Sequence, residues 1–315
     1  MRKTIHQKLP TNWDQKEKLR DKGQFWTPDW IADAMVAYVA RGADVVFDPG
    51  VGKGAFYTAL KKFAPKKKFF GTDIDPEIIA EARQEGIFGN DADLEIRDFI
   101  LNPPKKLFKA IVANPPYMRH HRLSPELKNH LRKMSLLNLG DTLDGRAGLH
   151  IYFLIQALSL LDKGGRLAFI MPADTCEGVF SKKLWSWISK KFCIDGVITF
   201  EHRATPFPGV DTNAVIFLIK NEKPMDKIRW AKCLEPQNKE LVKFLKNDLV
   251  GKSYGGLDIY ERDLTEALLA GLSRAPRTDH DFEFTLTDFA RVVRGIATGA
   301  NEFFFLTRDK AKEIG

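Results

Sequence analysis

The chain has 315 residues, 44% hydrophobic and 29% charged, a composition that is typical of a globular protein and excludes disordered and fibrous chains. No apolar run reaches about eighteen residues, the length of a membrane span, so we expect a cytoplasmic protein with no membrane partner. The net charge of +8 fits a polyanionic partner, although many basic proteins bind none.

Short apolar strands alternate with helical patterns along the first two thirds of the chain. A helix is predicted over residues 28–40, with Thr27 as its N-cap and Pro28 at its first position. Strands are predicted over 45–48, 68–73, 94–99, 110–113, 166–171, 194–200 and 214–220, and further helices from Gly54, over 76–84 and 150–161, and after Phe180. This alternation predicts an α/β fold with a mostly parallel sheet covered on both faces.

The last predicted strand is reached across Pro206-Phe207-Pro208-Gly209, which is too short for a crossover helix. We therefore expect the strand over 214–220 to enter the sheet antiparallel. The periodicity weakens from Asn221 onward, which predicts a catalytic domain over 1–221 and a connecting region over 222–286. Residues 287–315 are again well patterned and are interpreted as the start of a DNA target-recognition domain that is cut short.

The glycine-rich segment 48–56 follows a strand and opens a helix, where a backbone without side chains lets a small ligand approach closely. Its glycines, Gly50, Gly52 and Gly54, are spaced G-x-G-x-G and differ from the dinucleotide pattern G-x-G-x-x-G. Asp48 stands at the strand end and would repel a pyrophosphate. It would attract the ammonium and sulfonium groups of S-adenosylmethionine, which is the predicted cofactor.

Acidic residues also end the next two predicted strands. Asp73 is placed to accept the hydroxyl protons of a ribose, and Asp98 to accept from the adenine amine of the cofactor. An acid at a strand end can instead cap a helix or pair with a lysine. Three acids in succession, including Asp48, favour the cofactor interpretation.

The tetrapeptide Asn114-Pro115-Pro116-Tyr117 follows the strand over 110–113, at the edge where open α/β sheets bind ligands. An amine conjugated to an aromatic ring is a poor nucleophile, and two acceptors on its N–H groups would localise its lone pair. The Asn114 amide oxygen and the Pro115 carbonyl are the candidate acceptors, and Tyr117 offers a face on which a base can stack. The alternative is a proline-rich turn with an incidental tyrosine.

With these motifs the chain resembles the gamma-class N6-adenine DNA methyltransferases of restriction–modification systems, the TaqI-type arrangement, over residues 23–221. Residues 23–28 (Gly-Gln-Phe-Trp-Thr-Pro) resemble that family's N-terminal cofactor motif, and the order of glycine loop, acids and Asn-Pro-Pro-Tyr is the gamma order. The resemblance implies a Rossmann-like class I S-adenosylmethionine-dependent fold, with Thr27 and Asn114 among the cofactor-binding residues. It implies double-stranded DNA as substrate, methylated at N6 of a flipped adenine, and a restriction endonuclease or specificity subunit as partner.

Two further segments take their interpretation from this resemblance. Phe207 matches the late aromatic that packs against the flipped adenine, although a core phenylalanine is the alternative. Residues 294–304 resemble the start of the recognition region in related type II enzymes.

Residues 118–147 form an unusually long and basic segment after the tetrapeptide. Its basic residues are Arg119, His120, His121, Arg122, Lys128, Arg132 and Lys133. The segment either closes over DNA or holds a solvated amphipathic helix around 125–133. The paired histidines have no third ligand in view, and the three cysteines lack a C-x-x-C pair, so no metal site is predicted.

Three other functions remain open from the sequence. A protein-glutamine N5 methyltransferase of the release-factor type also uses the Asn-Pro-Pro-Tyr tetrapeptide, but such enzymes carry a helical domain before the glycine loop and little after the last strand. N4-cytosine enzymes usually show serine where Asn114 stands. A non-catalytic DNA-binding subunit with the same fold would not need intact cofactor acids.

Overall fold

The computed structural model describes residues 26–208 and 213–276, together with residues 284, 286–291, 293 and 307–314. The chain divides into two compact units, Met1–Pro276 and Arg277–Gly315. The described part of the second unit contains α10 (Leu286–Phe289) and α12 (Arg308–Ile314). Residues 23–25 of the N-terminal motif, Gly209, and the predicted start of the recognition region at 294–304 lie outside the described residues.

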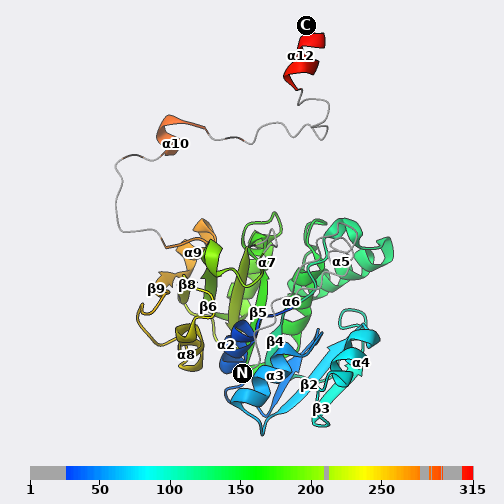
Figure 1. The fold of residues 1–315 in the computed structure, drawn as a ribbon. Coiled ribbons are helices and arrows are strands. Elements are labelled where there is room, and N and C mark those ends of the chain that lie inside the picture. Colours follow the sequence, from blue (N-terminus) through cyan, green and yellow to red (C-terminus); the bar gives the residue numbers. More distant parts are fainter. Residues whose placement is uncertain are drawn as a thin grey trace. The chain divides into compact units, whose positions relative to one another are not determined.

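The first unit is built on one nine-stranded sheet with the order β3-β2-β1-β4-β5-β7-β6-β8-β9 (Figure 1). The strands are β1 (Val45–Asp48), β2 (Lys68–Asp73), β3 (Ala92–Ile96), β4 (Phe108–Ala113), β5 (Leu161–Pro172), β6 (Cys193–Phe200), β7 (Ala214–Lys220), β8 (Lys227–Cys233) and β9 (Leu257–Asp263). Strands β1 to β6 and β8 run in one direction, and β7 and β9 run against them. The predicted mostly parallel sheet with an antiparallel last strand over 214–220 is confirmed.

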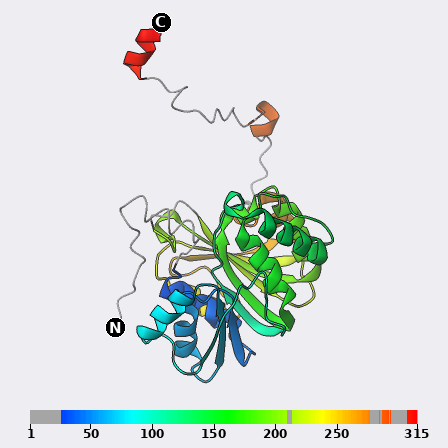
Figure 2. The same cartoon turned by 90° about the vertical axis from the view of Figure 1, so that its right-hand side faces the viewer.

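Helices cover both faces of this sheet. One face carries α2 (Asp29–Val39), α3 (Ala55–Phe63), α4 (Pro76–Gln84) and α8 (Lys239–Lys246). The other carries α5 (Pro125–Leu139), α6 (Leu149–Ser159), α7 (Ser181–Lys191) and α9 (Leu264–Ala270). In Figure 2 the green helices of the second group lie together in front of the strands. The unit is therefore a three-layer α/β/α structure.

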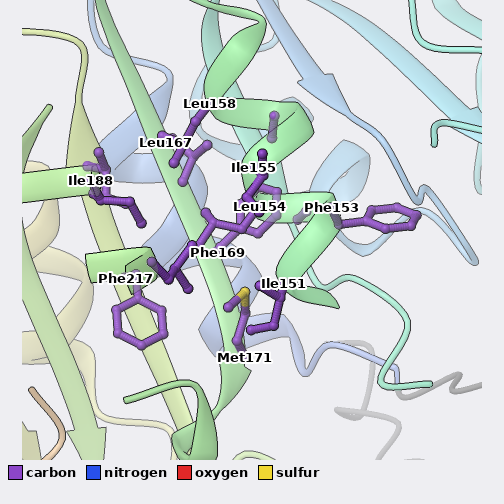
Figure 3. Close-up of a cluster of buried hydrophobic side chains, with 14 of the residues drawn as sticks. Ile151, Phe153, Leu154, Ile155, Leu158, Leu167, Phe169, Met171, Ile188 and Phe217 are labelled. Atoms are coloured by element: carbon purple, nitrogen blue, oxygen red, sulfur yellow. The ribbon is translucent and has the colours of Figure 1, made fainter. Parts of the chain in front are cut away.

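The core follows from the two-residue alternation of a strand that is buried on both faces. Along β5, Leu167, Phe169 and Met171 pack toward α6 and α7, while Ala168 and Ile170 pack toward α2. Figure 3 shows the first set among the apolar side chains of α6, with Ile188 of α7 and Phe217 of β7 beside them. This packing holds the carboxyl end of β5 rigidly beside that of β4.

Local signals fix where several helices begin. Asp75 accepts a hydrogen bond from the Glu77 backbone N–H at 3.1 Å, and Pro76 follows at the first helical position of α4. Ser124 does the same for α5, accepting from the Leu127 N–H at 3.2 Å. The helix expected around 125–133 is thus present, and it extends to Leu139.

Three features of the fold differ from the sequence prediction. Helix α2 begins at Asp29, so its N-cap residue is Pro28 and not Thr27 as expected. Strand β3 ends at Ile96, so Asp98 does not end a strand as expected; it lies in the turn that follows. Strands β8 and β9 lie within the region expected only to connect domains, and they extend the same sheet. The pattern of β9 was hidden because buried Arg262 takes an inward position on that strand, where its guanidinium binds both carboxylate oxygens of Glu266 at 2.9 Å. The domain boundaries stay predictions.

Candidate functional site

A cavity of about 600 Å³ opens at the carboxyl edge of the parallel strands. Its walls come from the glycine loop after β1, the turns after β2 and β3, the segment after β4 and the start of α6. The lining includes six of the predicted site residues, namely Thr27, Gly50, Gly52, Asp73, Asp98 and Asn114. The volume falls in the range typical of small-molecule sites.

The glycine loop has backbone conformations at two positions that favour glycine over any other residue. Gly52 and Gly54 have φ values of 47° and 75°, in the left-handed region. A Cβ on Gly54 would also lie 2.7 Å from the Phe88 ring. The Gly52 N–H donates to Asp73 Oδ2 at 2.8 Å, which ties the loop to the end of β2.

Asp48 lies behind the loop, not on the cavity wall. Its side chain is fully buried, and Oδ1 accepts from the Gly50 N–H at 3.1 Å. Oδ2 has no hydrogen-bond partner among the described residues, and burial raises the pKa of Asp48 well above its ordinary value. Asp48 therefore shapes the loop, and direct cofactor contact by this carboxyl stays a prediction.

Asp73 and Asp98 both reach the cavity. Asp73 Oδ1 accepts from the Asp75 N–H at 3.0 Å, and burial raises the pKa of Asp73. Asp98 Oδ1 accepts from the N–H groups of Ile100 and Leu101 at 2.8 and 3.0 Å, so it closes the turn after β3. These bonds fix the orientation of each carboxyl group on the cavity wall.

The Asn-Pro-Pro-Tyr tetrapeptide directly follows β4. The Asn114 amide nitrogen donates to the Thr27 hydroxyl at 3.1 Å, which turns the amide oxygen away from that hydroxyl. Pro116 lines the cavity, while Pro115 is buried outside its lining. The Thr27 bond gives a physical reason for a threonine upstream of the glycine loop, because it orients a side chain that lies 87 residues later.

Tyr117 lies at the other end of the tetrapeptide. Its hydroxyl donates to the Ile170 carbonyl of β5 at 2.9 Å, and burial raises the pKa of this phenol well above its usual range. Phe207 meets the ring edge-to-face, with centroids 6.5 Å apart. Phe207 is only 6% exposed and joins the core on the α2 side. The structure thus brings Phe207 to the tetrapeptide but also buries it, and its role in base binding stays a prediction.

Several residues that line the cavity were not singled out from the sequence. Ile74 follows Asp73 and is 66% exposed although it is apolar; Phe99 and Ile100 add further apolar wall. The available signal for Ile74 was an apolar residue directly after a strand-end acid. Trp26 also lines the cavity, and its ring lies 4.9 Å from the Lys53 ammonium. Its signal was membership of the predicted cofactor motif over residues 23–28, in which only Thr27 was named as a cofactor contact.

The charge of the cavity wall is mainly acidic. Asp29, Asp73, Glu85 and Asp98 face it, against Lys53 and Arg97. Lys53 pairs with Glu85 at 3.2 Å and Arg97 with Glu95 at 2.7 Å, which leaves an excess of carboxyl groups. Such a wall favours a ligand that carries positive charge.

The described part of the chain holds neither a cluster of metal-binding side chains nor a membrane-spanning helix. No group of three or more His, Cys, Asp or Glu side chains there is arranged to hold a metal ion. None of the helices in that part of the chain combines the length and the apolar character needed to cross a membrane.

Known proteins resemble this chain in sequence. The family described as the Eco57I restriction-modification methylase matches residues 67–207. The type II methyltransferase M.AccI of Acinetobacter calcoaceticus is 25% identical over 299 residues, which cover 92% of this chain and 54% of that protein. M.XamI of Xanthomonas campestris pv. amaranthicola is 27% identical, covering 89% of this chain and 52% of its own. The resemblance to the restriction–modification methyltransferases is thereby confirmed.

Solved structures of the same group share the fold. A type I restriction-modification methyltransferase subunit from Streptococcus thermophilus superposes with a TM-score of 0.61 at 15% identity, over 82% of this chain and 61% of the other. The type IIG restriction endonuclease BpuSI gives 0.64 at 19% identity, over 82% and 33%. The expected class I S-adenosylmethionine-dependent methyltransferase fold is confirmed. The chain spans about half the length of the type II relatives.

Proposed function

We propose that this chain transfers a methyl group from S-adenosylmethionine to N6 of an adenine extruded from double-stranded DNA, as the modification enzyme of a restriction–modification system. The carrying observation is that Asn114, the first residue of the tetrapeptide, lines one cavity together with the glycine loop and Asp73. The type II methyltransferase relatives support DNA as the substrate. A restriction endonuclease or specificity subunit as partner, and a cytoplasmic location, belong to the same proposal.

The residues of the cavity fit the cofactor. Asp73 would accept from the ribose hydroxyls, and Ile74 and Phe99 would cover the two sides of a flat adenine ring. Asp98, held by two backbone N–H groups, would face the adenine amine. The acid excess on the wall would balance the cofactor's cationic end near Gly50.

The chemistry then rests on groups that this chain supplies. S-adenosylmethionine, when bound, offers a methyl group activated by a sulfonium. The Asn114 amide oxygen, oriented by the Thr27 bond, and the Pro115 carbonyl would accept from the adenine N6 hydrogens and localise the nitrogen lone pair. Tyr117 would hold the base by stacking, with its ring fixed through the bond to Ile170.

The test is methyl transfer by the protein at its natural full length. Purified protein and tritiated S-adenosylmethionine are incubated with adenine-rich genomic DNA, and the digested product is analysed for N6-methyladenine and N4-methylcytosine. Single-molecule sequencing of the same DNA then maps the target site. We expect N6-methyladenine at one short sequence. Label found only in protein glutamine, with none in DNA, would replace this proposal by the glutamine N5 methyltransferase.

A further inference from the structure

His150, the second residue of α6, is a buried polar side chain that the proposed chemistry does not use. The residue is 6% exposed, and neither Nδ1 nor Nε2 has a hydrogen-bond partner among the described residues. Burying a polar group without a partner destabilises a fold, and most buried polar groups are paired. An imidazole with two unpartnered nitrogens therefore indicates a ligand that pairs with them.

The backbone places His150 directly beside the tetrapeptide. The Leu149 N–H donates to the Met118 carbonyl at 2.9 Å, which joins the start of α6 to the residue after Tyr117. Gly148 permits this approach, because a Cβ there would lie 2.7 Å from the imidazole and 3.1 Å from the Met118 carbonyl oxygen. The imidazole meets the Tyr117 ring with centroids 5.9 Å apart and planes at 73°.

A stacked adenine would need a hydrogen-bond donor at this place. Its ring nitrogens N1, N3 and N7 only accept. Two donors of the tetrapeptide already have acceptors elsewhere, since the Tyr117 hydroxyl donates to Ile170 and the Asn114 amide nitrogen donates to Thr27. A base stacked on Tyr117 lies about 3.5–4 Å from that ring, so its edge comes beside an imidazole that touches the same ring.

The protonation state of His150 suits this task. Burial lowers its pKa to about 4, so the imidazole is neutral near pH 7 and carries one N–H and one lone pair. A neutral donor can bind a ring nitrogen without placing a positive charge beside a base that must react with a cationic methyl donor.

We propose that His150 is a recognition residue for the extruded base and donates one hydrogen bond to a ring nitrogen of the target adenine. The inference rests on the proposed function and adds to it the group that fixes the rotation of the base against Tyr117. It also predicts discrimination: a ring nitrogen that carries a hydrogen, as N1 of guanine does, would meet the imidazole N–H with a donor.

The test is a cycle that combines protein and substrate changes. Duplexes with adenine, 1-deazaadenine, 3-deazaadenine or 7-deazaadenine at the mapped target are methylated by the wild type and by His150→Phe, which keeps an aromatic ring but no donor. We expect one analogue to slow the wild type about five- to tenfold, which corresponds to the loss of one neutral hydrogen bond. His150→Phe should methylate that analogue at the same rate at which it methylates adenine. Binding of 2-aminopurine duplexes is followed by fluorescence as a second readout.

The control is Tyr152→Phe, which removes a buried polar atom from the same helix and should leave all four rates in their wild-type ratios. If His150→Phe fails to fold, His150→Gln, which keeps a donor, should methylate adenine and remain sensitive to the same analogue. If the rate loss caused by each of the three analogues is the same in His150→Phe as in the wild type, the proposed role of His150 is overturned. The proposed function would then still stand, because the wild type methylates DNA. A wild type that methylates no DNA would overturn the proposed function as well.

Discussion

His150 also makes the stability of the protein depend on pH. In an unfolded chain its pKa is 6.5, whereas burial in the folded protein lowers it to about 4. Between these two pH values the histidine is therefore protonated in the unfolded state and neutral in the folded state. The stabilisation from this site is present above pH 6.5 and is lost as the pH falls toward 4.

The size of the effect follows from the same two values. Each pH unit between them is worth about 1.4 kcal/mol, so the gap between 6.5 and about 4 corresponds to about 3.5 kcal/mol once both states are protonated. At pH 4.5 the unfolded histidine is almost fully charged and the folded one is still mostly neutral, so about 2.5 kcal/mol should be lost relative to pH 7.5.

Urea unfolding at several pH values between 7.5 and 4.5 measures this loss. Other groups titrate in the same range, so the informative quantity is the difference in unfolding free energy between the wild type and His150→Phe at each pH. That difference should move by about 2.5 kcal/mol in favour of the variant at low pH. The Tyr152→Phe difference should stay level, because tyrosine does not titrate in acid. A level curve for His150→Phe would refute a buried neutral imidazole.

Four further substitutions test the site. Asp73→Ala should weaken S-adenosylmethionine binding in calorimetry, both by losing the ribose acceptor and by releasing the Gly52 N–H bond; unchanged affinity would contradict the ribose assignment. Asn114→Ala should lower the methylation rate by about 10²–10³ with cofactor affinity little changed, and a near wild-type rate would contradict the mechanism. Tyr117→Phe should cost about 1 kcal/mol of stability with a mild effect on rate, and unaltered urea unfolding would mean that the bond to Ile170 contributes nothing. Phe207→Leu should keep the melting temperature close to wild type and change the fluorescence of target 2-aminopurine, whereas unchanged fluorescence would make Phe207 a core residue only.

The sequence predicted the parallel core well because the apolar residues of each strand and helix there recur at the spacing typical of that element. Strands β1, β2 and β7 and helix α4 have the predicted bounds, since strand-end acids and the Asp75-Pro76 start are strong local signals. The prediction failed at β3, whose last residue is Ile96. Asp98 reaches the cavity from a turn, which a pattern of apolar residues cannot distinguish from a strand end.

The site was predictable where chemistry dictates residue types, and not where packing does. Asp73 and Asn114 belong to motifs whose proposed function requires those side chains, and both line the cavity. The burial of Asp48 could not be read from its position, because depth depends on how α6 and the loop close over the strand end. His150 lies in a helix whose buried side resembles any core helix, so only the unpartnered ring nitrogens reveal it.

The antiparallel direction of β7 has a consequence for which segments of this protein can change in sequence or length without disturbing the sheet. Strand β6 ends at Phe200 and β7 begins at Ala214, both on the edge where the tetrapeptide lies, so the segment between them starts and ends on the substrate side of the sheet. Residues 118–147 join that same edge from the other side of β5. Insertions or exchanges in either segment would alter the substrate side and leave the register of β1, β2 and β4 untouched. Such a division would let the substrate side change while Gly50, Gly52, Asp73 and Asp98, which lie on other segments of the cavity wall, keep their places.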